Sequence, residues 1–270
     1  FCQFADVVLP ACTSFERSEV KAYPGGWVNY TSPAIQPLYE SRDDVSIITM
    51  AADALDLDDP LLRSGYHATI GHIYRDVPID LAAVKAAGLP QKIPSGPGKD
   101  FFSAPLKTPS GKIELYSERI ARYTQSHGLD PLPVYLSGYD DTSPQDFPMC
   151  LITGGRLPNA VHSRLHEVPW LRSLRPDPAA DIHPEDARHM DIQQGDEIYI
   201  VTSVGRIRVK ANLTAISAPG EVNFYHGYRE ANVNEIIPKD HLDPYSGFPA
   251  YRSARCGIRK KGGEQNGINS

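Results

Sequence analysis

Ile152-Thr-Gly-Gly-Arg-Leu-Pro-Asn-Ala-Val-His-Ser-Arg164 is the most informative stretch of the chain. The apolar run just before it, 149–152, predicts a short buried strand that opens into a glycine turn. Gly154 and Gly155 let a backbone come close to a bulky ligand. Arg156 adds a planar guanidinium group that suits phosphate oxygens. Together these features predict a site for a phosphate-bearing cofactor.

The common nucleotide motifs do not explain this stretch. It has neither the Lys-Ser/Thr pair of a P-loop nor the third glycine of a dinucleotide fingerprint. A glycine pair by itself usually marks only a turn. The residues around the pair must therefore support any functional interpretation.

Composition narrows the class of protein. The 270 residues are 41% hydrophobic and 22% charged, which is typical of a globular protein with one large or two modest domains. A net charge of −6 argues against a nucleic-acid surface. No apolar run is long enough to span a bilayer, so we expect no direct membrane insertion. The four cysteines contain no CxxC pair, which excludes a local iron–sulfur or zinc-ribbon motif in this chain.

Residues 1–127 read as the end of an α/β domain that is truncated at its N-terminus. The run 4–10 predicts a buried strand, and an irregular segment follows as far as Tyr39. Apolar residues at helical spacing predict a helix with one buried face over Val45–Leu55. A second helix is predicted over Asp80–Ala87, ended by Gly88. The segment Thr108–Ser117 reads as a turn followed by an alternating strand.

Residues 128–146 have the Pro, Asp, Gly and Ser content of a domain linker. The pattern then changes to short strands with turns over 147–262, which favours a small β-barrel. A helix is predicted over Pro184–His189, with Pro184 at its first position. Strands are predicted at Met149–Thr153, Glu197–Thr202, Arg206–Leu213 and Glu221–Tyr225. The tail 263–270 is predicted to be disordered.

Four blocks, in this order, resemble the molybdenum or tungsten bis-pterin oxidoreductases of the dimethyl sulfoxide reductase family. They are 5–11 with Glu16, 108–117, 153–164, and the run from 182–184 through 195–196 to 243–244 and 251–252. The resemblance implies a C-terminal portion of the catalytic subunit, in which an α/β segment precedes a double-psi β-barrel. Residues 16–26 are closer to the branch with sulfur-compound reductases, acetylene hydratase-like proteins and aromatic hydroxyl-transfer enzymes.

The resemblance also implies where the cofactor binds. The loop from Thr153 to His162 would wrap one pterin guanine dinucleotide, with the backbone of Gly154 and Gly155 and the Arg156 side chain facing the pterin and the diphosphate. Further hydrogen bonds would come from His162 and Ser163. Late in the chain, three residues match positions that touch pterin in relatives: His226, Asn234 and Arg252.

Other parts of the enzyme are expected outside this chain. The resemblance places the metal ligand upstream, in an N-terminal part of the same subunit, together with any cysteines that hold an iron–sulfur cluster. The metal would be molybdenum or tungsten, the substrate a small molecule, and an electron-transfer subunit a further partner. The chain alone should then be inactive, and the compartment stays open between cytoplasm and periplasm.

Alternatives remain at this point. The same cofactor could support a non-redox hydratase or hydroxyl-transfer reaction, and the chain could be a stand-alone binding module without catalysis. Locally, Arg164 and His166 could belong to a solvated face, and His183 should order the entry to its helix. Glu16, Lys21 and Trp27 could line a substrate funnel or serve only a salt bridge and packing.

Overall fold

The computed structural model describes residues 2, 4–94, 105–135, 145–240 and 242–261. Contacts divide the chain into an N-terminal unit, Phe1–Ile113, and a C-terminal unit, Glu114–Ser270. The predicted tail 263–270 and the middle of the predicted linker, 136–144, lie outside the described residues.

The N-terminal unit is built on an antiparallel hairpin of β1 (Glu19–Tyr23) and β2 (Trp27–Thr31), to which the short β3 (Gln91–Lys92) adds an edge. The sequence interpretation missed this hairpin and treated 10–39 as irregular. Gly25 and Gly26 have φ values of 87° and 77°, so only glycines turn the chain here without strain. The turn chemistry was visible in the sequence, but its flanking strands were not recognised.

Three helices accompany the hairpin: α1 (Asp44–Ala54), α2 (Gly65–Ile73) and α3 (Leu81–Ala87). The helices predicted over Val45–Leu55 and Asp80–Ala87 are confirmed. The Asp43 side chain accepts the Ser46 N–H at the start of α1, and Gly88 ends α3 in the left-handed conformation. The buried face expected for α1 is wrong for most of its length, because Ile48 is 51% and Leu55 is 70% exposed.

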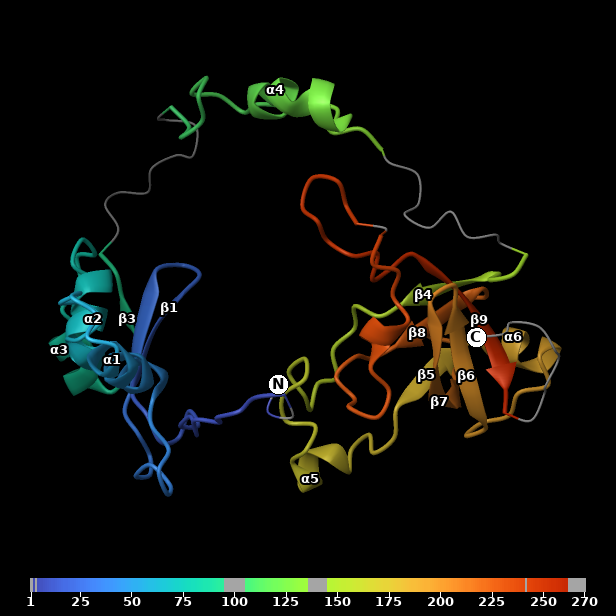
Figure 1. The fold of residues 1–270 in the computed structure, drawn as a ribbon, viewed down its shortest axis with the longest axis horizontal. Helices are drawn as coiled ribbons and strands as arrows, with labels where there is room; N and C mark the ends of the chain where they lie inside the picture. The colour runs from blue at the N-terminus through green and yellow to red at the C-terminus, as the bar shows by residue number, and fades with distance from the viewer. Residues whose placement is uncertain (1, 3, 95–104, 136–144, 241, 262–270) are drawn as a thin grey trace. The chain divides into compact units, whose positions relative to one another are not determined.

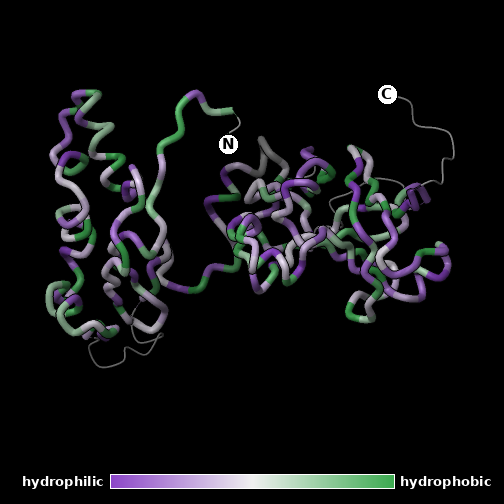
Figure 2. Tube along the Cα trace, turned by 90° about the horizontal axis from the view of Figure 1, so that it is seen from below, coloured by the Kyte–Doolittle hydropathy of each residue, from purple (hydrophilic) through white to green (hydrophobic). Residues whose placement is uncertain are grey.

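Two predicted strands are absent from the described residues. The run 4–10 is extended but pairs with no described strand, and Val7 is 74% exposed. Figure 2 shows this stretch as a largely hydrophobic tube. Residues 112–117 are also not a strand; instead Ser117 accepts the Ile120 N–H and begins α4 (Glu118–His127). An alternating pattern forms a strand only where a partner strand supplies the backbone hydrogen bonds.

The C-terminal unit is a closed barrel of six strands, in the order β4-β8-β5-β7-β6-β9, which Figure 1 shows wrapping around one another. Two neighbouring pairs, β4 with β8 and β5 with β7, are parallel, and the other pairs are antiparallel. The strands are β4 (Met149–Ile152), β5 (Ala179–Ile182), β6 (Glu197–Thr202), β7 (Gly205–Leu213), β8 (Glu221–Phe224) and β9 (Ala254–Lys260).

The barrel confirms the strands predicted around Met149, Glu197, Arg206 and Glu221, although β5 and β9 were missed. Alternate residues of each strand fill the interior; in β7 these are Ile207, Val209 and Ala211. The helix α6 (Pro184–His189) is confirmed, and His183 caps it by accepting the Glu185 N–H. Two short helices complete the unit, α5 (Pro169–Arg172) and the 3-10 turn η1 (Val233–Glu235).

Candidate functional site

The glycine turn begins where β4 ends. Thr153 is buried, and both its backbone N–H and its hydroxyl donate to the Tyr251 carbonyl oxygen, each at 2.8 Å. These two bonds tie the start of the turn to the segment just before β9. Arg252 is thereby held next to Gly154.

Both glycines of the turn have close side-chain neighbours. A Cβ atom on Gly154 would lie 2.6 Å from Nε of Arg252, and one on Gly155 would lie 3.0 Å from Cε1 of Tyr225. A side chain at either position would push Arg252 or Tyr225 away. The turn therefore lies close to two neighbouring side chains, and the close approach to a ligand stays a prediction.

A cavity of about 670 Å³ opens over this turn. It brings together seven of the nine cofactor-binding residues predicted from the sequence: Thr153, Gly154, Arg156, His162, His226, Asn234 and Arg252. Gly155 lines a neighbouring cavity of about 270 Å³, together with Gly154 and Arg252. Ser163 lines neither cavity and is exposed. No role for any of the nine follows from the geometry alone.

Two histidines that line the cavity lie next to each other. His162 Nδ1 lies 3.0 Å from His226 Nε2, and His226 Nδ1 lies 3.1 Å from the Thr153 carbonyl oxygen. The positive charge of Arg156 lowers the pKa of His162, and desolvation, His226 and Arg164 act in the same direction. This pKa shift favours the neutral imidazole.

The sequence interpretation missed Gly227, which makes this arrangement possible. Its φ is 110°, and a Cβ atom there would lie 2.3 Å from the His162 carbonyl oxygen and 2.4 Å from Nε2 of His166. His166 is buried, bonds the His162 carbonyl oxygen at 3.0 Å and meets the Tyr228 ring edge-on. His166 therefore supports the cavity wall from behind. A Gly after His226 was the available signal.

The loop 242–253 supplies much of the cavity lining, and of this loop the sequence interpretation had assigned only Arg252 to the site. Tyr251 donates its hydroxyl to Oδ1 of Asn234 at 3.2 Å, and Phe248 packs edge-on against the Tyr251 ring. The Asp243 carboxylate accepts the backbone N–H groups of Tyr245 and Ser246, so it stabilises the loop turn. Nothing in the periodicity of this loop marks it as a cavity wall.

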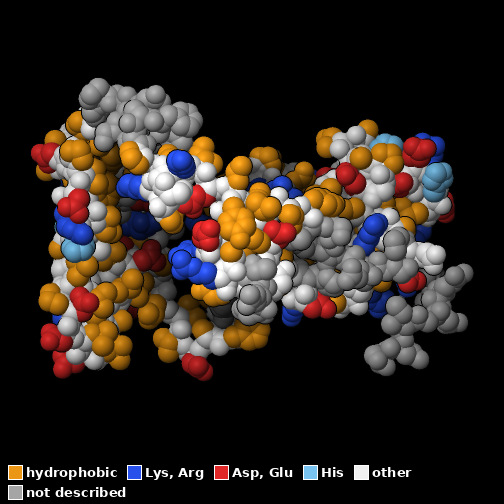
Figure 3. Space-filling model, turned by 90° about the horizontal axis from the view of Figure 1, so that it is seen from above, with side chains coloured by type: hydrophobic (Ala, Val, Ile, Leu, Met, Phe, Trp, Pro, Cys, Tyr) orange, Lys and Arg blue, Asp and Glu red, His pale blue; other side chains and the backbone are white. Residues whose placement is uncertain are grey.

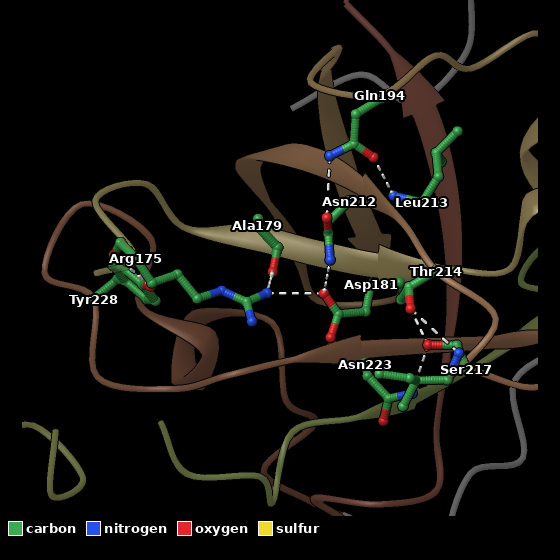
Figure 4. Close-up of polar contacts among 11 residues, drawn as sticks. Arg175, Ala179, Asp181, Gln194, Asn212, Leu213, Thr214, Ser217, Asn223 and Tyr228 are labelled. Carbon is green, nitrogen blue, oxygen red and sulfur yellow. Dashed lines mark hydrogen bonds and ion pairs between the residues drawn. The ribbon is translucent and has the colours of Figure 1, made fainter. Parts of the chain in front are cut away.

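A buried polar network fixes the segment that carries His226 (Figure 4). Asp181 in β5 is 5% exposed and accepts bonds from Arg175 and Asn212, each at 2.8 Å. The guanidinium group of Arg175 lies 4.5 Å from the centre of the Tyr225 ring, and Tyr228 donates its hydroxyl to the Arg175 carbonyl oxygen. Arg175 thus holds Tyr225 against the glycine turn. The sequence gave no motif for this network.

The residues proposed for a substrate funnel lie in the N-terminal unit and have other partners. Glu16 is buried and accepts the N–H groups of Leu38 and Thr13 at 2.6 and 2.7 Å. These bonds, with Leu38 contributing most, lower the pKa of Glu16 to about 2. Lys21 lies 5.4 Å over the Tyr23 ring, and Trp27 is 44% exposed. Glu16 therefore organises its own loop.

In the ranges that the structure describes, no three His, Cys, Asp or Glu side chains lie close enough together to hold a metal ion. In the same ranges, no helix has the length and apolar character that a membrane span needs.

Comparison with known families identifies the class of protein. Residues 150–255 match the family profile described as "Molydopterin dinucleotide binding domain", and residues 1–53 match "Molybdopterin oxidoreductase". The barrel with its glycine turn and cavity is thus a molybdopterin dinucleotide-binding domain. The chain belongs to the molybdopterin oxidoreductase family, as its resemblance to the dimethyl sulfoxide reductases predicted.

Individual relatives include both reductases and a hydratase. The chain is 27% identical over 256 residues to acetylene hydratase of Syntrophotalea acetylenica, which covers 91% of this chain and 33% of that protein. It is 26% identical over 253 residues to the dimethyl sulfoxide reductase of Escherichia coli, covering 83% of this chain and 31% of that protein. Dopamine dehydroxylase of Eggerthella lenta is 29% identical over 179 residues, 60% of this chain and 18% of that protein.

A solved structure shares the fold. Acetylene hydratase from Pelobacter acetylenicus superposes with a TM-score of 0.78 at 23% sequence identity, covering 96% of this chain and 38% of that one. The chain spans about a third or less of the length of the three curated relatives.

Proposed function

We propose that this chain forms part of the catalytic subunit of a molybdenum or tungsten pterin enzyme and cradles a pterin guanine dinucleotide. The observation that carries the proposal is the cavity over the Gly154-Gly155 turn, which gathers two arginines, two histidines and an asparagine within the residues that match the dinucleotide-binding profile. A barrel with two parallel strand pairs supports the finer proposal of a double-psi barrel.

The chemistry of the cavity fits such a group. Arg156 and Arg252 supply guanidinium forks for a diphosphate. Asn234 can both donate to and accept from a heterocycle edge. Gly154 and Gly155 leave no side chain where the turn meets Arg252 and Tyr225. We assign Ser163 only a peripheral role, because it lines neither cavity.

When bound, two dithiolene pterins would carry the metal that exchanges an oxygen atom or electrons with a small substrate. The residues of this chain would hold and orient the pterin and screen its diphosphate charge. We assign the metal ligand, any iron–sulfur cluster and any contact with an electron-transfer subunit to other parts of the protein. The isolated chain should then turn over no substrate.

Binding of guanosine diphosphate to the 270-residue chain tests the proposal by calorimetry. Arg156→Gln and Arg252→Gln should each weaken binding about tenfold or more, because a hydrogen bond to a charged group contributes about 1.5–3 kcal/mol. Arg259→Gln, an exposed arginine at the end of β9, is the matched control and should change nothing. No measurable binding by the unaltered chain would contradict the proposal.

A non-redox hydration or hydroxyl transfer on the same cofactor is the second candidate. The similarity to acetylene hydratase over 91% of the chain favours it. The whole enzyme purified from its source would separate the two reactions. Turnover without any external electron donor or acceptor supports the hydratase, whereas strict dependence on one supports the oxidoreductase.

A further inference from the structure

We propose that His226 is a positioning residue that fixes the tautomer of His162, so that His162 presents an unprotonated Nε2 to the cavity as a hydrogen-bond acceptor. The acceptor would receive an N–H group of the bound heterocycle. This last step rests on the proposed function, whereas the tautomer assignment rests on the geometry of the chain alone.

The tautomer of His226 follows from its contact with Thr153. A carbonyl oxygen can only accept a hydrogen bond, so the 3.1 Å contact between His226 Nδ1 and the Thr153 oxygen requires a proton on Nδ1. A neutral imidazole carries one N–H, which leaves a lone pair on Nε2 of His226. The fixed position of Thr153, which donates twice to Tyr251, holds that carbonyl in place.

The tautomer of His226 in turn determines the tautomer of His162. Its Nδ1 lies 3.0 Å from Nε2 of His226, and one of the two nitrogens must donate. Because Nε2 of His226 already has the lone pair, Nδ1 of His162 carries the proton. Nε2 of His162 is then the acceptor, and His162 is among the residues that line the cavity. His162 is itself held in the left-handed conformation, with φ of 55°.

The surrounding charges favour the neutral form of His162. Arg156 from the glycine turn and Arg164 from the following turn face His162 and lower its pKa, and His226 from the end of β8 acts in the same direction. Behind them, Nε2 of His166 lies 3.0 Å from the His162 carbonyl oxygen, so that nitrogen carries a proton, and His166 is not among the residues that line the cavity.

This arrangement divides recognition between two chemical groups. A phosphate ester is deprotonated at neutral pH and offers only acceptors, so it suits Arg156 and Arg252 and has nothing to donate to His162. The amino-pyrimidinone edge of a pterin carries N–H donors, which match the acceptor on His162. Nε2 of His226 is bonded to His162 and so does not contact the ligand. Through this bond, His226 determines that His162 accepts a hydrogen bond from the ligand.

Nitrogen NMR of the full 270-residue chain labelled with ¹⁵N-histidine tests the tautomers at pH 8. His162→Gln identifies the His162 signals. Two variants separate the two bonds of His226. His226→Gln can still accept from His162 through its side-chain oxygen, whereas His226→Asn can still donate to Thr153 but no longer reaches His162.

We expect His162 to be protonated on Nδ1 in the unaltered chain and in His226→Gln, and to lose that preference in His226→Asn. A proton on Nε2 of His162 in the unaltered chain would overturn the proposal. Equal spectra for His162 in both variants would also overturn it. A purely structural role for His226 predicts loss of folding instead, which the dispersion of the other histidine signals reports.

Titration with 6-hydroxymethylpterin tests the acceptor role. We expect the His162 Nε2 resonance to shift on binding, and His226→Asn to weaken binding about fivefold or more while His226→Gln changes it less than twofold. Binding without a change at Nε2 would overturn the acceptor role and leave the proposed cofactor standing. Absence of binding to the unaltered chain would overturn both the acceptor role and the pterin site.

Discussion

The two units of the chain use their apolar residues very differently. Among the described residues, 24 of the 28 buried hydrophobic side chains belong to the C-terminal unit and four to the N-terminal unit, namely Val28, Tyr30, Ala52 and Val84. A closed barrel has an interior that every strand faces, so alternation along each strand fills one core. The three-stranded sheet of the N-terminal unit ends in a strand of two residues and covers little.

The N-terminal unit also exposes many apolar side chains. Figure 3 shows hydrophobic side chains spread over the visible face of the N-terminal unit, among charged ones. The exposed apolar residues of this unit include Val7 at 74%, Leu55 at 70% and Ile73 at 60%. We therefore expect the barrel to carry a large, cooperative stability of its own and the N-terminal unit to be weaker in this chain.

Truncation of the barrel core should have the largest effect. Phe224 is 1% exposed, and Phe224→Ala should lower the free energy of unfolding by about 4 kcal/mol, because it removes buried area and leaves a cavity. Hydrogen exchange with mass spectrometry resolves the two units. Exchange should accelerate in barrel peptides and stay unchanged in peptides from 19–92; acceleration in both would show that the comparison between the units is wrong.

Gly227→Ala should have the second largest effect, about 3 kcal/mol, because it combines backbone strain with two contacts below 2.5 Å to His162 and His166. Gly220→Ala is the matched control. It has a similar positive φ of 80° but nothing within 4 Å of the added Cβ, so it should cost about 1 kcal/mol. Urea unfolding measures both, and equal costs would mean that the cavity wall yields to the added methyl group.

The barrel was also the part that the sequence predicted best. Alternation in 197–202 and 206–213 and the helix start at Pro184 identified β6, β7 and α6, because these elements find their partners close in sequence. β5 and β9 were missed; Asp181 in β5 breaks the apolar pattern, although Arg175 and Asn212 satisfy it in the fold. Asn212 lies 31 residues after Asp181, and a partner at that distance cannot be identified from one sequence.

In the candidate site, too, residues that lie close together in sequence were easier to predict than residues from distant segments. Motif positions identified the turn and seven of the fifteen residues that line the cavity; Gly154, Arg156 and His162 lie within one short segment. Gly227, Tyr251 and the loop 242–253 come from distant segments, and only the closing of the barrel brings them to the turn. In the N-terminal unit, the pattern over 4–10 predicted a strand that no described neighbour completes.

The N-terminal unit should dominate the acid sensitivity of the chain. The pKa of Glu16 is lowered to about 2 from 4.5, so its stabilising contribution is fully present above pH 4.5 and is lost as the pH falls toward 2. Trp27 lies in this unit, and its fluorescence in a Trp170→Phe background reports acid unfolding. Glu16→Gln should lower stability at pH 6 and flatten the pH dependence between 4.5 and 2, whereas Glu40→Gln at an exposed position should do neither.

The smallest effect is expected where the sequence predicted a buried helix face and the structure exposes it. Ile48 in α1 is 51% exposed, so Ile48→Ser should change the free energy of unfolding of this chain by no more than about 0.5 kcal/mol. Ala52, on the same helix, is 2% exposed, and Ala52→Ser serves as the contrast because it places a polar hydroxyl at a buried position.

Urea unfolding followed by Trp27 fluorescence measures both substitutions in the same background. A cost of 2 kcal/mol or more for Ile48→Ser would mean that apolar surface covers this face in solution. The contrast drawn between the two units would then be wrong for α1, because the apolar residues at helical spacing in 45–55 would form a buried face. A negligible cost would instead show that α1 forms without burial of Ile48.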